Sequence, residues 1–302
     1  MNRYLPWIPK KESVSARGDV PKKVTVSART DVKIEDDGAT IKIGDPDVWP
    51  PSTISDTQVI CLLDSTVTKI DLTYCSEITD KTIISIAEKC PSIKEIHLSY
   101  CNKLTEESLK AIGSKCKLLK RFVASDCANL FTEKGVEYLL GCKSLIALKV
   151  STCGELSDYA VELIVKSFPE LEELHLSVCG ISSLPEDIDN HLKRLKILSF
   201  GYNNLSDNAL ELIVTSFPTL EELYLIYCGI TSLPEDIGNH LKCLKKLDFG
   251  YNILTKLPRS IANLADTCKE FYISGNPLQE PPIEIAEESL EAVKRYFEEL
   301  DR

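Results

Sequence analysis

Apolar residues recur along most of this chain in one fixed frame, which reads apolar-x-x-apolar-x-apolar-x-x followed by a cysteine or an asparagine. One copy runs from Ile93 to Cys101, and a later copy runs from Leu195 to Asn203. The alternation inside the frame predicts a short β-strand with one buried face. The frame ends at nine residues spaced 24 to 26 positions apart: Cys75, Cys101, Cys127, Cys153, Cys179, Asn203, Cys228, Asn252 and Asn276. We predict nine similar units stacked in a row, with these nine residues forming an internal ladder.

The nine copies are of two kinds. The first four follow each ladder cysteine with an amphipathic run such as Ile83–Cys90, which is typical of a short helix. Later copies carry a Leu-Pro segment instead, at Leu184–Ile188, Leu233–Ile237 and Leu257–Ile261. Proline restricts such a segment to an extended or tight-turn path. The sixth copy, Leu205–Phe217, reverts to the helical kind.

The frame matches the L-x-x-L-x-L-x-x-N/C-x-L pattern of leucine-rich repeats. Residues 65 to about 170 resemble the cysteine-containing leucine-rich repeats of F-box substrate adaptors. The Leu-Pro copies resemble the typical repeats of intracellular Ras-associated scaffolds and related plant proteins. This resemblance implies an intracellular scaffold or adaptor. No F-box is recognisable in residues 1–60, where a proline-rich arm and a hairpin pattern stand in place of a run of helices.

The expected fold is therefore an α/β solenoid, a horseshoe with a parallel β-sheet on its concave side. We divide the chain into an extended basic arm (1–22), a β-meander and cap (23–64), the solenoid (65–278) and a capping helix (279–302). Period-two alternation around Asp37-Gly38 predicts the hairpin of the meander. An apolar stripe predicts one helix over about 283–300, formed by Ala286, Leu290, Val293, Phe297 and Leu300.

Charge is distributed unevenly along the chain. The formal net charge is −11, yet residues 1–33 carry eight basic groups against three acidic ones, so the remainder is strongly acidic. An acidic body excludes non-specific nucleic-acid binding, which depends on neutralising phosphates. The basic segment 1–33 is suited to an acidic surface. The start of the chain lacks the apolar stretch of a signal peptide, and no membrane span is expected.

Twelve cysteines are explained mainly by the repeat rather than by disulfides. Six lie in the ladder, Cys90, Cys116 and Cys142 form a second column with the same 26-residue step, and Cys268 stands at the first leucine position of the frame. Only Cys61 and Cys243 have no place in the frame. We expect free thiols in a reducing, cytoplasmic location, with a cytoskeletal location as the alternative. No zinc-ligand spacing occurs, so neither a metal nor a cofactor is expected.

The register of the frame identifies the side chains that should face the concave groove. They are the residue between the second and third apolar positions and the residue just before the ladder. Ten of these form the candidate partner-binding set: Tyr74, His97, Tyr100, Lys149, His175, Tyr202, Tyr224, Tyr227, Tyr251 and Tyr272. Tyrosine is enriched at interfaces because it offers a large area and a polar tip at little entropic cost. The alternative is that neighbouring rings only stack across strands and rigidify the sheet.

We find no motif for catalysis, since P-loop, G-x-S-x-G and H-E-x-x-H patterns do not occur. The leading hypothesis is a non-catalytic scaffold that holds a protein or peptide on its concave face. Three alternatives remain open: the substrate-recognition subunit of a ubiquitin ligase, a structural subunit of a large cytoskeletal assembly such as an axoneme, and a pathogen effector. The sequence does not distinguish among them.

Overall fold

The computed structural model describes residues 32–34, 40–43, 53–154 and 156–302, and within them it contains one sheet of eleven strands. β1 pairs with β2 in antiparallel fashion, and every later neighbour pairs in parallel and in chain order. The strands are β1 (Val32–Ile34), β2 (Thr40–Ile43), β3 (Lys69–Asp71), β4 (Glu95–His97), β5 (Arg121–Ser125), β6 (Ala147–Ser151), β7 (Glu173–Ser177), β8 (Ile197–Ser199), β9 (Glu222–Tyr224), β10 (Lys246–Asp248) and β11 (Glu270–Tyr272). The predicted α/β repeat solenoid with a parallel sheet is confirmed.

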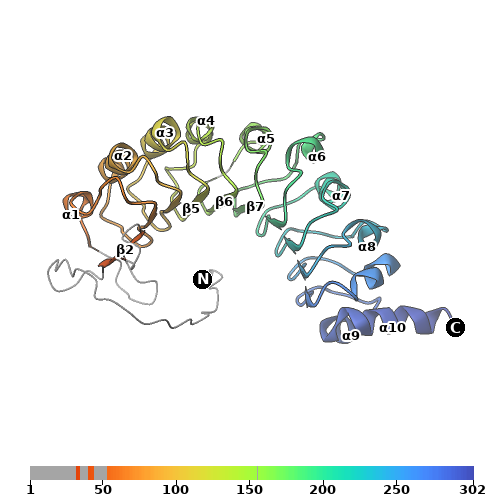
Figure 1. Ribbon diagram of the computed structural model, residues 1–302. Coiled ribbons are helices and arrows are strands. Elements are labelled where there is room, and N and C mark those ends of the chain that lie inside the picture. The colour runs from red at the N-terminus through yellow and green to blue at the C-terminus, as the bar shows by residue number, and fades with distance from the viewer. Residues whose placement is uncertain (1–31, 35–39, 44–52, 155) are drawn as a thin grey trace.

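The helices lie along the outside of an arch, and the strands line its inside (Figure 1). The helical segments are α1 (Asp56–Ile60), α2 (Asp80–Lys89), α3 (Glu106–Lys115), α4 (Glu133–Leu139), α5 (Asp158–Ser167), α6 (Ile188–His191), α7 (Asp207–Ser216), α8 (Ile237–His240), the 3-10 helix η1 (Arg259–Leu264), α9 (Ile283–Glu288) and α10 (Leu290–Leu300). The first four copies and the sixth carry helices of seven to ten residues, whereas each Leu-Pro copy carries a shorter helical segment of four to six residues.

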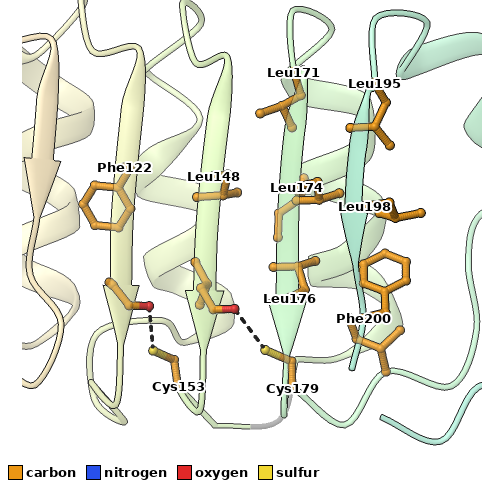
Figure 2. Packing of buried hydrophobic residues seen from close by; sticks show 14 of the residues in the cluster. Phe122, Leu148, Cys153, Leu171, Leu174, Leu176, Cys179, Leu195, Leu198 and Phe200 are labelled. Atoms are coloured by element: carbon orange, nitrogen blue, oxygen red, sulfur yellow. Dashed lines mark hydrogen bonds between the residues drawn. The ribbon is translucent and has the colours of Figure 1, made fainter. Parts of the chain in front are cut away.

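The core runs along the whole solenoid between the sheet and the helices. Its central column contains the second residue of each strand from β3 to β10, including Phe122, Leu148, Leu174 and Leu198, and each of these four is fully buried (Figure 2). The ladder lies below this column. A ladder cysteine donates its thiol to a backbone carbonyl of the preceding repeat, as Cys153 does to Ala124. The ladder therefore joins each unit to the one before it.

Asparagine occurs in the ladder only after a short turn, although Cys228 also follows a short turn, Asn203–Leu205, whose Leu205 N–H donates to the backbone carbonyl of Cys228. In the first three copies the next apolar residue stands three positions after the cysteine, and the turn closes on itself: the Leu104 N–H donates to the Cys101 carbonyl. From the fifth copy on, the next apolar residue stands only two positions after the ladder residue. There the Oδ1 atom of Asn252 accepts from the N–H groups of Cys228 and Ile230, at 2.8 and 3.1 Å.

The amide side of Asn252 completes the arrangement, because its Nδ2 atom donates to the carbonyls of Leu225 and Phe249 at 2.8 and 2.9 Å. Asn203 makes the equivalent four bonds in its own repeat. A thiol is only a weak acceptor, so it cannot serve two buried N–H groups. A short turn thus favours asparagine at the next ladder position, where its side chain supplies the acceptor for both N–H groups.

A second series of polar contacts links the helices on the convex side. Thr105 caps the N-terminus of α3, and the carboxylate of Asp80 in α2 accepts from its N–H and its hydroxyl at 2.9 and 2.8 Å. Asp56 in α1 accepts in the same way from Thr79, which caps α2. Burial opposes ionisation of Asp56, but these hydrogen bonds outweigh it, so its pKa lies below the ordinary value. The starts of α2 and α3 are therefore each fixed by the preceding helix.

The two ends differ in how well the sequence predicted them. The antiparallel pair β1–β2 confirms part of the expected meander, whereas the arm 1–22, the strand at 23–27 and the turn at Asp37-Gly38 lie outside the described residues. The C-terminal segment 283–300 is helical as predicted, but it consists of two helices, α9 and α10, instead of one. Ser289 is extended, with φ near 180°, and its hydroxyl caps α10 by accepting from the Ala292 N–H. Leu300 is exposed and does not belong to the buried stripe.

All twelve cysteines are unpaired, and ten of them are buried. The two exposed ones are Cys61 and Cys243, the pair that the repeat frame leaves without a place. Burial raises the pKa of Cys116 and Cys142 to about 12. These thiols therefore act as small core residues. Among the helices of the described residues, none is long and apolar enough to cross a membrane.

Candidate concave binding surface

The residue before each ladder position adopts a left-handed backbone, with φ between 53° and 65° in eight successive repeats. Strict alternation from the strand would turn this side chain inward and the ladder residue outward. The left-handed residue resets that alternation. Tyr227 and Tyr251 thus lie at the surface, 44% and 50% exposed, while Cys228 and Asn252 are buried. The side chains of this column face outward as the sequence predicted, but the left-handed turn places them there, not the alternation of side chains along the strand.

Three of these tyrosines, Tyr202, Tyr227 and Tyr251, form a continuous stack that we call the tyrosine ledge. The ring centroids of Tyr202 and Tyr227 are 4.8 Å apart, and those of Tyr227 and Tyr251 are 4.6 Å apart with planes only 8° from parallel. The ledge ends at Gly275, where a Cβ atom would lie 2.6 Å from the Tyr251 ring. Glycine at this position lets the last ring lie against the backbone.

A second cluster lies on the strands beside the ledge. Tyr224 and Tyr272 flank Lys246, whose ammonium nitrogen is 5.5 and 5.7 Å from their ring centroids. Lys246 also pairs with the carboxylate of Glu270 at 2.8 Å, and the Tyr224 hydroxyl donates to Glu222 at 2.6 Å. We call Tyr224, Lys246 and Tyr272 the strand cluster. The five tyrosines of repeats six to nine thus divide into two groups.

A smaller aromatic pair occurs at the other end of the solenoid. Tyr74 and Tyr100 stack with centroids 4.4 Å apart and planes 8° from parallel. Burial, and after it the Asp126 carboxylate, raises the pKa of the Tyr100 hydroxyl. Burial likewise raises the pKa of Asp126. This pair belongs to the same concave edge as the ledge but lies four repeats away from it.

Two of the remaining predicted residues, His97 and Lys149, have charged partners of their own. His97 contacts Glu95 at 2.8 Å through Nε2. Lys149 and Arg121 both pair with the Glu173 carboxylate, at 2.7 and 2.9 Å. Burial opposes ionisation of Glu173, but the hydrogen bonds from the two cations outweigh it and lower the pKa.

His175 differs from its neighbours because its Nε2 atom is buried without a hydrogen-bond partner. Burial, and after it the nearby Lys149 ammonium, lowers the pKa of His175 to about 4. The imidazole is therefore neutral near pH 7. Strands β5 and β6 separate His175 from His97, so the two concave histidines do not form a common site, as the repeat spacing predicted.

One outward column escaped the sequence analysis. It is the first position of each strand and contains Lys69, Glu95, Arg121, Glu173, Glu222, Lys246 and Glu270 among its members. These residues supply most of the charges on the concave face and hold the predicted tyrosines and lysines in place. The signal was available, because residues i and i+2 of a strand share one face.

One recess lies away from the aromatic surface, at the edge where strands β7 to β11 begin. It has a volume of about 680 Å³, and its lining includes Lys196, Glu172, Lys245 and Glu221. These four are joined in ion pairs, Lys196 to Glu172 at 2.8 Å and Lys245 to Glu221 at 2.6 Å. Within the described ranges, no group of three His, Cys, Asp or Glu side chains could hold a metal ion.

Comparison with known proteins identifies the architecture. The leucine-rich repeat family model matches residues 89–113. TLR13, in its complex with ssRNA13, superposes with a TM-score of 0.54 at 19% identity, over 74% of this chain and 30% of that one. An internalin (inlF) from Listeria monocytogenes superposes with a TM-score of 0.51 at 14% identity, over 80% and 74%. This chain therefore spans less than a third of TLR13. A search of curated proteins finds no match.

Proposed function

The chain is a leucine-rich repeat protein, and we propose that it is a non-catalytic scaffold that binds a protein or peptide on the concave face of its solenoid. This fold generally mediates protein–protein interaction. The proposed contact residues are the ten concave side chains identified above. The tyrosine ledge and the strand cluster form the centre of the surface, and Tyr74, His97, Tyr100, Lys149 and His175 extend it toward the N-terminus.

The distribution of exposed apolar side chains supports this proposal. Nine large hydrophobic residues are exposed among the described residues, and five of them lie between residues 178 and 272 at the concave edge or next to it: Val178, Tyr227, Tyr251, Ile253 and Tyr272. Contiguous apolar surface of this kind on a soluble protein usually has a partner. Stacking alone does not require rings that are half exposed.

The test removes the ledge and measures capture and stability separately. We expect Tyr202→Ala, Tyr227→Ala and Tyr251→Ala, combined in one chain, to abolish partner capture while lowering stability by at most about 1 kcal/mol per stacked pair. Tyr159→Ala is the matched control, because Tyr159 is 51% exposed on helix α5 at the convex side. If capture survives in the triple variant and its melting temperature falls sharply, the rings are structural only.

The cysteine pattern supports a reducing, intracellular location. Ten unpaired thiols are buried in the core, where oxidation would disturb the packing. Cell fractionation of the tagged full chain tests this, and the expected fraction is the cytoplasm. A membrane-enclosed oxidising compartment would contradict it. Deleting residues 1–33 then separates two roles, because a subunit anchored through its basic segment would detach, whereas a free adaptor would keep its concave binding.

A further inference from the structure

We infer that repeats six to nine bind a cationic segment of polypeptide, with lysine or arginine side chains lying against the tyrosine ledge and the carboxylates beside it. This inference rests on the proposed function and specifies the chemistry of the partner at that same surface. It follows from the charge, the aromatic geometry and the dimensions of strands β8 to β11.

The outward strand positions of this region carry an excess of negative charge. Strands β9, β10 and β11 present the carboxylates of Glu222, Asp248 and Glu270, and Lys246 is the one ammonium group among those outward positions. Three carboxylates and one ammonium leave two negative charges without a cationic partner on these strands. Burial raises the pKa of Tyr224, and next Glu222, Glu270 and Asp248 raise it further, as expected where the potential is negative.

The surface already holds a cation between two aromatic rings. Lys246 lies between Tyr224 and Tyr272, in the geometry of a cation–π contact on both sides. The Lys246 side chain is only 19% exposed, and its ammonium group neutralises the Glu270 carboxylate. The space between the two rings is therefore already occupied by a cation of this chain. Within the part of the chain that the structure describes, Glu222 accepts only from the Tyr224 hydroxyl and Asp248 only from the Gly250 N–H, so each carboxylate can also accept from an incoming cation.

The ledge supplies the apolar part of such a site. Lysine and arginine bury their aliphatic stems along apolar surface while their charged heads stay near polar groups. Asp248 precedes Tyr251 by three residues in the same repeat, so the carboxylate and the exposed ring belong to one short stretch of chain. Four strands with neighbours about 4.8 Å apart span roughly 14 Å, which an extended segment of about five residues would cross.

Charge argues against a nucleic acid on the same surface. Phosphate binding depends on clustered lysines and arginines, whereas these strands carry a net negative charge. A stack of tyrosines can also serve as a platform for bases, so single-stranded RNA is included as a competing probe.

The experiment measures binding of three fluorescent probes to the full chain by anisotropy. The probes are a short peptide of alternating arginine and glycine, the same peptide with glutamate in place of arginine, and a single-stranded RNA. We expect only the arginine peptide to bind, and added salt to weaken it. Glu222→Gln and Asp248→Asn, made together, should lower its affinity about tenfold. Glu235→Gln is the control, because Glu235 is exposed in a convex turn of the same region.

The outcomes separate this inference from the proposed function. Equal binding of the glutamate peptide, stronger binding of the RNA, or unchanged affinity in the double variant would overturn the cationic partner. If the double variant melts earlier than the wild type, the salt dependence of the unaltered chain decides, and its absence overturns the inference. If the ledge variant loses partner capture but the arginine peptide does not bind the unaltered chain, the proposed concave binding is supported. In that case only the inference that the partner is cationic is rejected.

Discussion

Replacing Asn252 by cysteine tests why the ladder changes residue along the solenoid. Cysteine is the natural occupant of six other ladder positions, so the substitution is tolerated in shape. Asn252 is 5% exposed and makes two acceptor and two donor contacts with neighbouring backbone. A thiol could still donate to the Leu225 carbonyl, as Cys228 does to Phe200 at 3.2 Å. It would leave the N–H groups of Cys228 and Ile230 without an acceptor.

The expected loss follows from those two groups. A buried backbone N–H that loses its acceptor costs about 1–3 kcal/mol, so Asn252→Cys should destabilise the protein by about 3 kcal/mol. Urea unfolding, monitored by circular dichroism, measures the total loss in free energy of unfolding. Amide hydrogen exchange measures the site directly, and protection of the Cys228 and Ile230 amides should fall more than that of amides in the first four repeats.

The control replaces a different asparagine in the same half of the solenoid. Asn263 makes one exposed contact, to the Asn239 Oδ1 atom, so Asn263→Ala should cost less than about 0.5 kcal/mol. The reasoning is refuted if Asn252→Cys costs no more than Asn263→Ala, or if exchange at Cys228 and Ile230 is unchanged. Either result would mean that turn length does not select the ladder residue.

Three further predictions concern other parts of the fold. Asp80→Ala should lower the free energy of unfolding by about 2 kcal/mol, because Thr105, the N-cap of α3, loses its acceptor. Thermal melts check this, with the exposed Glu235→Gln variant as the control. Val178→Asn should stabilise by up to about 1 kcal/mol, because Val178 is β-branched at a φ of 55°; a lower urea midpoint would contradict it. Burial makes the pKa of His175 lower in the folded chain than in the unfolded chain, so the unfolded chain binds the imidazole proton first as pH falls. The free energy of unfolding should therefore be highest above about pH 6.5 and decline as the pH is lowered toward 4. His175→Gln should decline less over that range.

The apolar frame made the solenoid predictable from sequence, because its period fixes both the positions of the strands and which of their residues are buried. The same frame placed Tyr202, Tyr227 and Tyr251 in one column. It could not show that they stack, since ring orientation depends on a left-handed backbone that the pattern does not encode. The apolar stripe over 283–300 concealed the break at Ser289, because a local hydroxyl cap interrupted the helix without disturbing its period.

The charges around the tyrosines were harder to infer. Lys246 lies in a strand position that the sequence analysis assigned to no column, yet it organises Tyr224 and Tyr272. Its role depends on contacts with side chains of three neighbouring strands, and the repeat pattern does not show which residues of different repeats lie side by side. Cross-strand contacts of this kind need the register as well as the pattern.

Site-specific photo-crosslinking in cells tests the central claim most directly, that the concave face of repeats six to nine is where a partner binds. A benzophenone amino acid replaces Tyr227 in one chain and Tyr159 in another, so that the two probes sit on opposite faces of the arch. The account predicts a discrete crosslinked polypeptide from position 227 and none from position 159. Crosslinking from position 159 with none from position 227 would contradict it.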